Sequence, residues 1–118
     1  MTIQNFSEDI LFVDLPAKEP YIGDQLKDLN ETVLDKSDCD VVIDFFRVEI
    51  LNSSSLGNLM ILRNLLQDEH GRKLILCGVS VMTKYIFTVT GLDKVFTFAE
   101  DRSAALAALQ CAKQSKEN

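Results

Sequence analysis

The stretch that decides the fold is Val41–Leu66, which reads VVIDFFRVEILNSSSLGNLMILRNLL. It opens with an apolar run, Val41–Phe46, that is rich in β-branched and aromatic residues. The run is too short for a typical helix and therefore predicts a buried strand. Leucines then recur at steps of three and four residues, which is the spacing of one helical face. These leucines are Leu56, Leu59, Leu62 and Leu66.

Four small polar residues lie between this strand and this helix, namely Asn52 followed by Ser53, Ser54 and Ser55. Short polar side chains at such a place accept hydrogen bonds from the unpaired N–H groups that open a helix, so we expect one of the three serines to be the cap. The same N–H groups and the helix dipole favour a nearby negative charge. A serine hydroxyl here is therefore a position at which a phosphoryl group would be stabilised.

The composition is that of an acidic globular chain of one domain's length. Its 118 residues include 18 acidic and 12 basic side chains, which gives a formal net charge of −6. Nucleic acids and anionic membranes are bound by basic patches. Because the lysines and arginines are scattered along the chain, we expect neither class of partner.

The cysteines and the hydrophobic pattern indicate the compartment. Cys39, Cys77 and Cys111 are odd in number, and no pair has the CxxC spacing of zinc or redox motifs. The N-terminal sequence lacks the basic and apolar regions of a signal peptide, and no apolar run approaches the length of a membrane span. We therefore expect a reduced, cytoplasmic protein without membrane insertion.

Strand-like and helix-like segments alternate along the chain, which is typical of an α/β layer fold. The expected strands are Thr2–Phe6, Ile10–Val13, Val41–Phe45, Lys73–Cys77 and Val95–Phe98, and the other three helices are expected around Ile22–Val33, Val81–Val89 and Ser103–Ala112. We expect a mainly parallel, mixed sheet of four or five strands flanked by four helices, with Val41–Phe45 at its centre. Residues 1–118 would form one domain, with a weak edge strand or turn over 1–9 and a frayed tail over 113–118.

Several polar residues and glycines are placed to begin or end the expected helices. Asp24, Ser80 and Asp101 are candidate caps for the first, third and fourth helices. Lys36 lies near the end of the first helix, where a positive charge is favourable. Gly71 is suited to a left-handed cap after the serine-led helix.

Sequence motifs of enzymes are absent. The chain contains no GxSxG, no glycine-rich phosphate loop and no metal-binding histidine pair. Its single histidine, His70, lies at the far end of the helix from the serines, so we expect no catalytic residues and no cofactor. Asp38, Asp40 and Asp44 are an alternative cation site, but a calcium-loop pattern with glycine is absent, and solvated loop charges are the favoured interpretation.

The order strand, loop, NSSSLG and helix resembles the STAS domain of anti-sigma factor antagonists, which typically shows DSSGLG or DSTGLG here. Downstream, GRKLILCGVS resembles the family's next strand and turn, and the TGL of Thr90–Leu92 followed by DKVF resembles its last helix end and strand. The resemblance covers roughly Ile10–Leu109. The family's aspartate is Asn52 in this chain, its glycine is Ser55, and LPAKEPYI at Leu15–Ile22 replaces its early GxLD loop.

The resemblance implies a regulatory interaction domain without enzymatic activity. The unphosphorylated domain would bind a serine kinase that doubles as an anti-sigma factor, with a serine phosphatase as a further candidate partner. The position that matches the family's phosphorylated serine is Ser53, and Ser54 is the weaker candidate. The residues expected to contact the partner are Arg47, Asn52, Ser53, Ser54, Ser55, Leu56, Gly57 and Asn58.

Two structural questions and two functional alternatives remain open at this point. Val48, Ile50 and Leu51 either line the functional face or pack beneath the helix. Gly57 costs helix stability, which indicates close approach by another backbone, either from within the chain or from a partner. The alternatives to a phosphoswitch are a constitutive STAS scaffold subunit and a small-molecule or nucleotide sensor.

Overall fold

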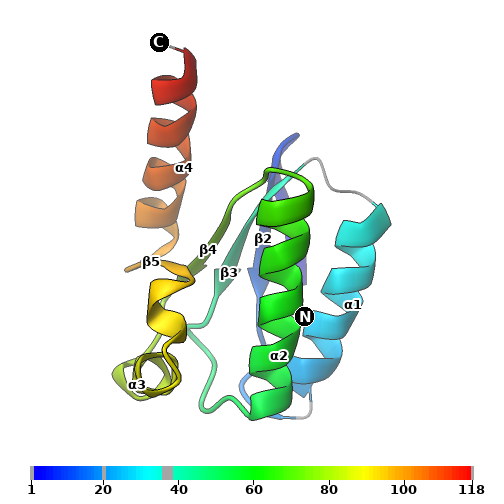
Figure 1. Cartoon of the computed structure of the whole chain (residues 1–118), viewed down its shortest axis with the longest axis vertical. Helices are drawn as coiled ribbons and strands as arrows, with labels where there is room; N and C mark the ends of the chain where they lie inside the picture. Colours follow the sequence, from blue (N-terminus) through cyan, green and yellow to red (C-terminus); the bar gives the residue numbers. More distant parts are fainter. Residues whose placement is uncertain (1, 20, 36–38, 118) are drawn as a thin grey trace.

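A five-stranded mixed sheet forms the centre of the molecule, with strand order β1-β2-β3-β4-β5 (Figure 1). The computed structural model describes residues 2–19, 21–35 and 39–117. The strands are β1 (Thr2–Ser7), β2 (Ile10–Asp14), β3 (Asp40–Asp44), β4 (Leu74–Cys77) and β5 (Thr97–Ala99). β1 and β2 form an antiparallel hairpin, and the remaining pairs are parallel. The predicted α/β class and the central position of the third strand are confirmed.

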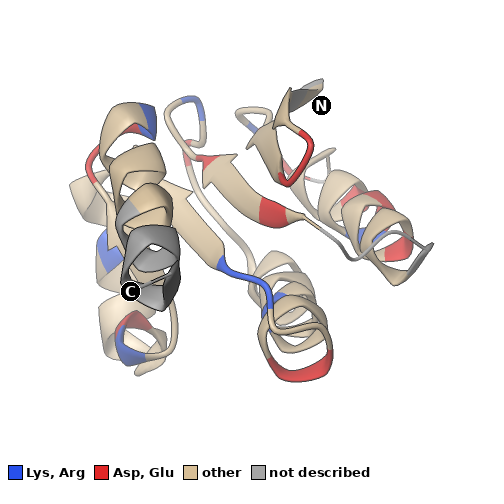
Figure 2. Cartoon of the chain, turned by 90° about the horizontal axis from the view of Figure 1, so that it is seen from above, with Lys and Arg blue, Asp and Glu red and all other residues tan. Residues whose placement is uncertain are grey.

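Within the described residues, four α-helices and two short helical segments complete the fold. The α-helices are α1 (Tyr21–Asp35), α2 (Ser53–Arg63), α3 (Val81–Val89) and α4 (Arg102–Glu117). A π-helical segment, η1 (Asn64–Glu69), continues α2, and a 3₁₀ turn, η2 (Leu92–Lys94), precedes β5. α1 and α2 cover one face of the sheet, and α4 packs on the other, as the view from above shows (Figure 2).

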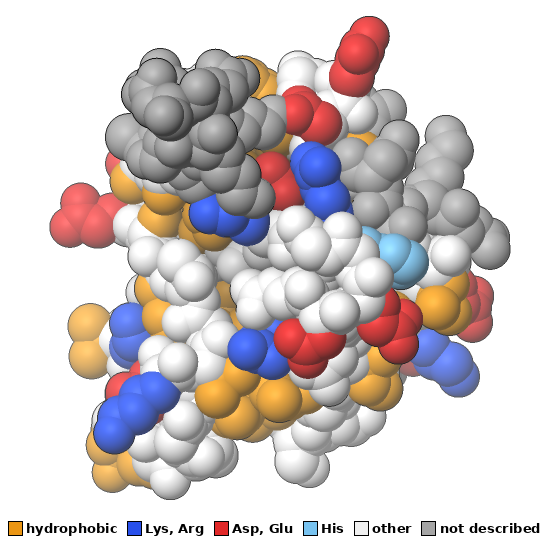
Figure 3. All heavy atoms as spheres, turned by 45° about the horizontal axis from the view of Figure 1, so that its top comes forward, with side chains coloured by type: hydrophobic (Ala, Val, Ile, Leu, Met, Phe, Trp, Pro, Cys, Tyr) orange, Lys and Arg blue, Asp and Glu red, His pale blue; other side chains and the backbone are white. Residues whose placement is uncertain are grey.

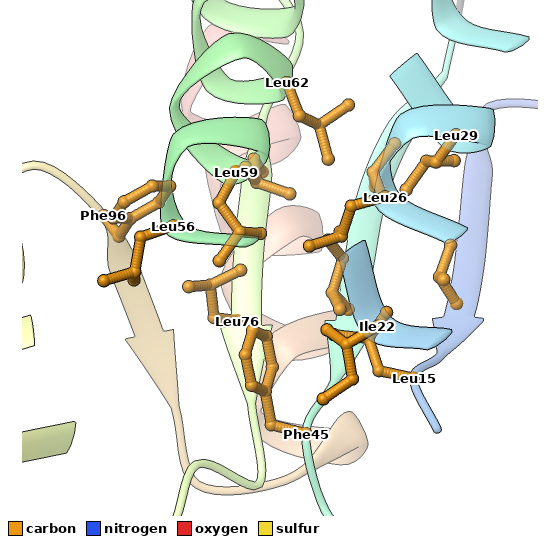
Figure 4. Packing of buried hydrophobic residues seen from close by; sticks show 14 of the residues in the cluster. Leu15, Ile22, Leu26, Leu29, Phe45, Leu56, Leu59, Leu62, Leu76 and Phe96 are labelled. Carbon is orange, nitrogen blue, oxygen red and sulfur yellow. The ribbon is translucent and has the colours of Figure 1, made fainter. Parts of the chain in front are cut away.

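The larger core lies between the sheet and the pair α1–α2. Residues 41, 43, 74 and 76 point to this face because side chains alternate along a strand. Leu26 of α1 and Leu59 of α2 point into the same space, next to Phe45 (Figure 4). The leucines predicted to share one helical face are all buried, and so are four apolar side chains of α1: Leu56, Leu59, Leu62 and Leu66, with Ile22, Leu26, Leu29 and Val33. Each such side chain contributes roughly 1.5–3 kcal/mol when it is fully buried.

The helix caps predicted from the sequence are found at some helix ends and not at others. Ser80 caps α3 by accepting a hydrogen bond from the Thr83 N–H at 3.1 Å, and the Asp101 carboxylate accepts one from the Ala104 N–H at 2.8 Å. Gly71 has the expected positive φ of 65°. The expected cap at Asp24 is wrong, because α1 already begins at Tyr21 and Asp24 lies inside its first turn.

The C-terminal helix is longer than predicted. Its backbone is helical to Glu117, beyond the expected end at Ala112. Lys36 lies outside the described residues. Within residues 2–19, 21–35 and 39–117, no helix has the length and apolarity needed to cross a bilayer. On the face that Figure 3 shows, acidic and basic side chains are interspersed (Figure 3).

Candidate functional site: the N-terminal turn of α2

The start of α2 lies at the edge of the sheet where the parallel strands end, beside the start of α1 (Figure 1). A loop from Phe45 to Asn52 connects β3 to this helix. Within the loop, Val48 and Leu51 are buried beneath the helices, whereas Phe46 and Ile50 are 84% and 63% exposed. Arg47 is exposed as well. The loop thus divides its apolar residues between the core and the surface.

Ser53 is the first residue of α2, and its side chain is exposed. The helix cap is Asn52, whose backbone is extended and whose Oδ1 accepts a hydrogen bond from the Ser55 N–H at 2.9 Å. The expectation that one of the serines is the cap is therefore wrong, and the Ser53 hydroxyl is not used for this purpose. Ser54 is also exposed. Both hydroxyls face solvent at the positive end of the helix dipole.

Ser55 differs from its two neighbours because its side chain is fully buried. Its hydroxyl donates a hydrogen bond of 2.5 Å to Oε1 of Glu19, from the loop before α1. The same oxygen lies 3.5 Å from the backbone nitrogen of Asn52. The other carboxylate oxygen of Glu19, Oε2, accepts a hydrogen bond from the Gly23 N–H at 3.3 Å. Glu19 was missed by sequence reasoning. The available signal was a glutamate in the loop that departs from the family pattern.

The next three predicted contact residues have different surroundings. Leu56 is buried in the core, with only 8% of its surface exposed. Gly57 is exposed, and apart from its own helix backbone and chain neighbours, a Cβ built there would have no heavy atom of the described residues within 4 Å. The internal close approach suggested for Gly57 is therefore wrong. Asn58 is half-buried, and its backbone carbonyl accepts a hydrogen bond from Asn30 of α1 at 3.2 Å.

A charged cluster lies at the same edge of the sheet, where α4 begins. Arg102, at the start of α4, donates hydrogen bonds to Asp14 and to Asp44, the latter at 2.9 Å. These two bonds raise the pKa of the Arg102 guanidinium. Burial, with a smaller effect of the Asp44 charge, raises the pKa of the neighbouring Cys77 thiol to about 11. The cluster ties α4 to the ends of β2 and β3.

The aspartates considered as a cation site are separated in the structure. Asp40 lies at the start of β3 and forms an ion pair with Arg72 at 3.2 Å, whereas Asp44 lies at the end of that strand. Asp38 is outside the described residues. No group of three potential metal-ligating side chains occurs within the described part of the chain.

Apolar side chains gather on the outer side of α3. Val81, Met82, Tyr85 and Val89 are 61–87% exposed. Between α3 and β5 lies a groove of about 530 Å³, where the Lys84 ammonium sits 3.7 Å from the centre of the Phe98 ring. Because exposed apolar patches of this kind commonly mark interaction sites, α3 offers a second surface for contact.

The order of these elements and the serine-led turn agree with a known family. The sequence model of the STAS domain matches residues 18–105 of the 118-residue chain. The chain belongs to the STAS domain family. A relative of this STAS domain is BtrV of Bordetella bronchiseptica, which is named for a proposed role as an anti-sigma factor antagonist. The two are 29% identical over 79 residues, which cover 67% of each chain.

Solved structures show the same fold at low sequence identity. A variant of RsbS from Moorella thermoacetica superposes with a TM-score of 0.80 at 17% identity, covering 96% of this chain and 97% of that one. A chain of the stressosome, a signal integration and transduction hub, superposes with a TM-score of 0.74 at 18% identity. The match covers 95% of this chain and 98% of that one. The anti-sigma factor antagonist SpoIIAA in its unphosphorylated form gives 0.75 at 15% identity, covering 92% and 95%.

Proposed function

We propose that this STAS domain is a regulatory protein that binds a serine kinase acting as an anti-sigma factor, and that phosphorylation of Ser53 ends this binding. Binding would occupy the kinase and release a sigma factor, in the cytoplasm and without catalysis by the STAS domain itself. The observation that carries the proposal is the exposed Ser53 hydroxyl at the first position of α2, which Asn52 leaves free by capping the helix. The family and the name of the relative BtrV support the class of partner.

The surroundings of the three serines favour Ser53 over the others as the phosphoacceptor. Ser55 is buried and already donates its hydroxyl to Glu19, so a kinase has no access to it. Ser54 is exposed but lies one residue further into the helix. A phosphoryl group on Ser53 would lie nearest to the unpaired N–H groups at the helix start, which stabilise negative charge.

The partner surface that we propose consists of exposed groups around this turn. Ser53, Ser54 and Gly57 form its centre, and Arg47 from the preceding loop lies at its edge. Asn52 orients the turn as its cap, and Asn58 links α2 to α1 through the Asn30 hydrogen bond. Ser55 and Leu56 support the surface from beneath, since their side chains are buried.

The direct test is to map phosphorylation on the purified chain. Candidate anti-sigma factor kinases from the organism that encodes the chain are incubated with it and ATP, and the product is sequenced by mass spectrometry. We expect a single phosphoryl group on Ser53, its loss in Ser53→Ala, and its retention in the matched control Ser54→Ala. Modification at Ser54 alone, or a kinase that binds and never phosphorylates the chain, would contradict the switch.

A second candidate function is a constitutive scaffold subunit without a phosphoswitch. The exposed apolar side of α3, centred on Val81 and Tyr85, favours it, because a subunit of an assembly needs a surface of this kind. The structural likeness to a stressosome chain is in keeping with this alternative. A scaffold would retain its partners in Ser53→Glu and would lose them in Val81→Asp, whereas a phosphoswitch at α2 predicts the loss in Ser53→Glu.

A further inference from the structure

The side chain of Glu19 connects three segments that meet at the candidate site. Its Oε1 accepts a hydrogen bond from the Ser55 hydroxyl of α2 at 2.5 Å. The same oxygen lies 3.5 Å from the backbone nitrogen of Asn52, the cap of α2. Its Oε2 accepts the Gly23 N–H in the first turn of α1 at 3.3 Å. One carboxylate thus joins the loop before α1, the start of α1 and the start of α2.

The local packing is built around this contact. A buried hydroxyl needs a hydrogen-bond partner, and a carboxylate is a stronger acceptor than a neutral group. Ser55 has no exposed surface, so Glu19 provides the partner that solvent cannot. Gly23 leaves the required room, because a Cβ at this position would lie 3.2 Å from the Ser55 hydroxyl oxygen.

Glu19 also provides the negative charge at the start of α2. No acidic residue occurs in the first turn of this helix, and the cap Asn52 carries a neutral amide. A carboxylate near the first turn is favourable because of the helix dipole. We propose that Glu19 is the positioning residue of the switch turn: it braces Asn52 and Ser55 so that Ser53 is held in one place, and it supplies the fixed negative charge of that turn.

The bracing does not depend on the proposed function, whereas the presentation of Ser53 to a kinase rests on it. The two parts are therefore tested by different measurements. Amide hydrogen exchange and unfolding equilibria need no partner protein. Kinase kinetics address the presentation of Ser53 alone.

The bracing is tested by exchange at the amides of Gly23, Asn52 and Ser55. Glu19→Ala should raise their exchange rates by about tenfold or more, because the acceptor that holds the two helix starts together is removed. The matched control is Glu49→Ala. Glu49 is an exposed carboxylate in the β3–α2 loop whose backbone contact with Ala17, 3.0 Å, survives the substitution. Equal effects of the two variants would overturn the assignment.

The role of the Glu19 charge is tested by adding a second carboxylate beside it. Asn and Asp cap helices about equally well, so Asn52→Asp mainly adds a second carboxylate beside Glu19. In the parent, this change should lower the folding equilibrium constant about fivefold, because the like charges repel. In Glu19→Gln the same change should instead raise the constant by about twofold or more, because the new carboxylate then supplies the negative charge that the helix dipole favours. Equal effects of Asn52→Asp in the two backgrounds would show that Glu19 acts without its charge. This result would overturn the proposal that Glu19 supplies the negative charge of the turn.

The presentation of Ser53 is tested with a kinase that phosphorylates the parent. Glu19→Ala should lower kcat/KM by about tenfold, because the hydroxyl is no longer held in place. Glu49→Ala should leave kcat/KM unchanged. Loss of amide protection without a change in kcat/KM would reduce Glu19 to a structural brace. Failure of every kinase on the parent chain would instead count against the proposed function, and the exchange and charge tests would still decide the bracing.

Discussion

At Gly57, the effect of a substitution on the stability of the fold can be measured separately from its effect on partner binding. It lies within α2, is exposed, and has open space where a Cβ would be, so alanine introduces no clash within the described chain. Glycine in a helix is less favourable than alanine by roughly 0.5–1 kcal/mol. Gly57→Ala should therefore stabilise the domain by about that amount, which corresponds to a rise in melting temperature of roughly 2–6 °C.

The same position should respond in the opposite direction when binding is measured. If the partner's backbone packs against the start of α2, a bulky side chain at Gly57 prevents close approach. Gly57→Arg should lose binding to the partner kinase by at least about 100-fold, or roughly 2.8 kcal/mol, with an unchanged circular dichroism spectrum. The assays are thermal unfolding and titration calorimetry. Destabilisation in Gly57→Ala would refute the open geometry, and undiminished affinity in Gly57→Arg would place the interface elsewhere.

Two further predictions concern the core. Leu59→Ala should lower the free energy of unfolding by about 2–5 kcal/mol, because it opens a cavity at a fully buried position; Leu34→Ala, at a site 59% exposed, should change it by less than about 0.5 kcal/mol in the same urea titrations. The raised pKa of Cys77 means that the folded state favours the neutral thiol. The stabilisation that this provides is fully present below pH 9.0, the ordinary pKa of a thiol, and the free energy of unfolding should fall as the pH rises towards about 11. Cys77→Ala should lack this loss, and identical pH profiles for the two proteins would contradict it.

The architecture was predictable because its signals are local and periodic. The leucine spacing that begins at Leu56 specifies one face of α2, and the apolar run at Val41 specifies a strand buried on both sides. Parallel order followed from the alternation of strands and helices. The positions of Ser80 and Asp101 as caps were also readable, because a cap bonds to the backbone within three residues.

The details of the site were less predictable because they depend on tertiary contacts. The bond between Ser55 and Glu19 joins residues 36 positions apart, so no spacing rule relates them. Asn52 and the serines have similar capping preferences, and only the entry of the chain into α2 decides between them. The glycine at position 57 suggested a close approach within the chain, but the space beside it is open, and local helix preference alone did not reveal this.

The central claim is that negative charge and bulk at Ser53 end binding while the fold is kept. A partner surface shaped for a neutral hydroxyl would have to desolvate the added charge, and a penalty on the order of 3 kcal/mol weakens binding about 100-fold. The most direct measurement is therefore the affinity of Ser53→Glu and Ser53→Ala for the same kinase, with melting temperatures recorded in parallel. We expect Ser53→Ala to bind like the parent and Ser53→Glu to bind about 100-fold more weakly, with melting temperatures within a few degrees of each other. Equal affinities for the two variants would contradict the phosphoswitch and favour the constitutive scaffold.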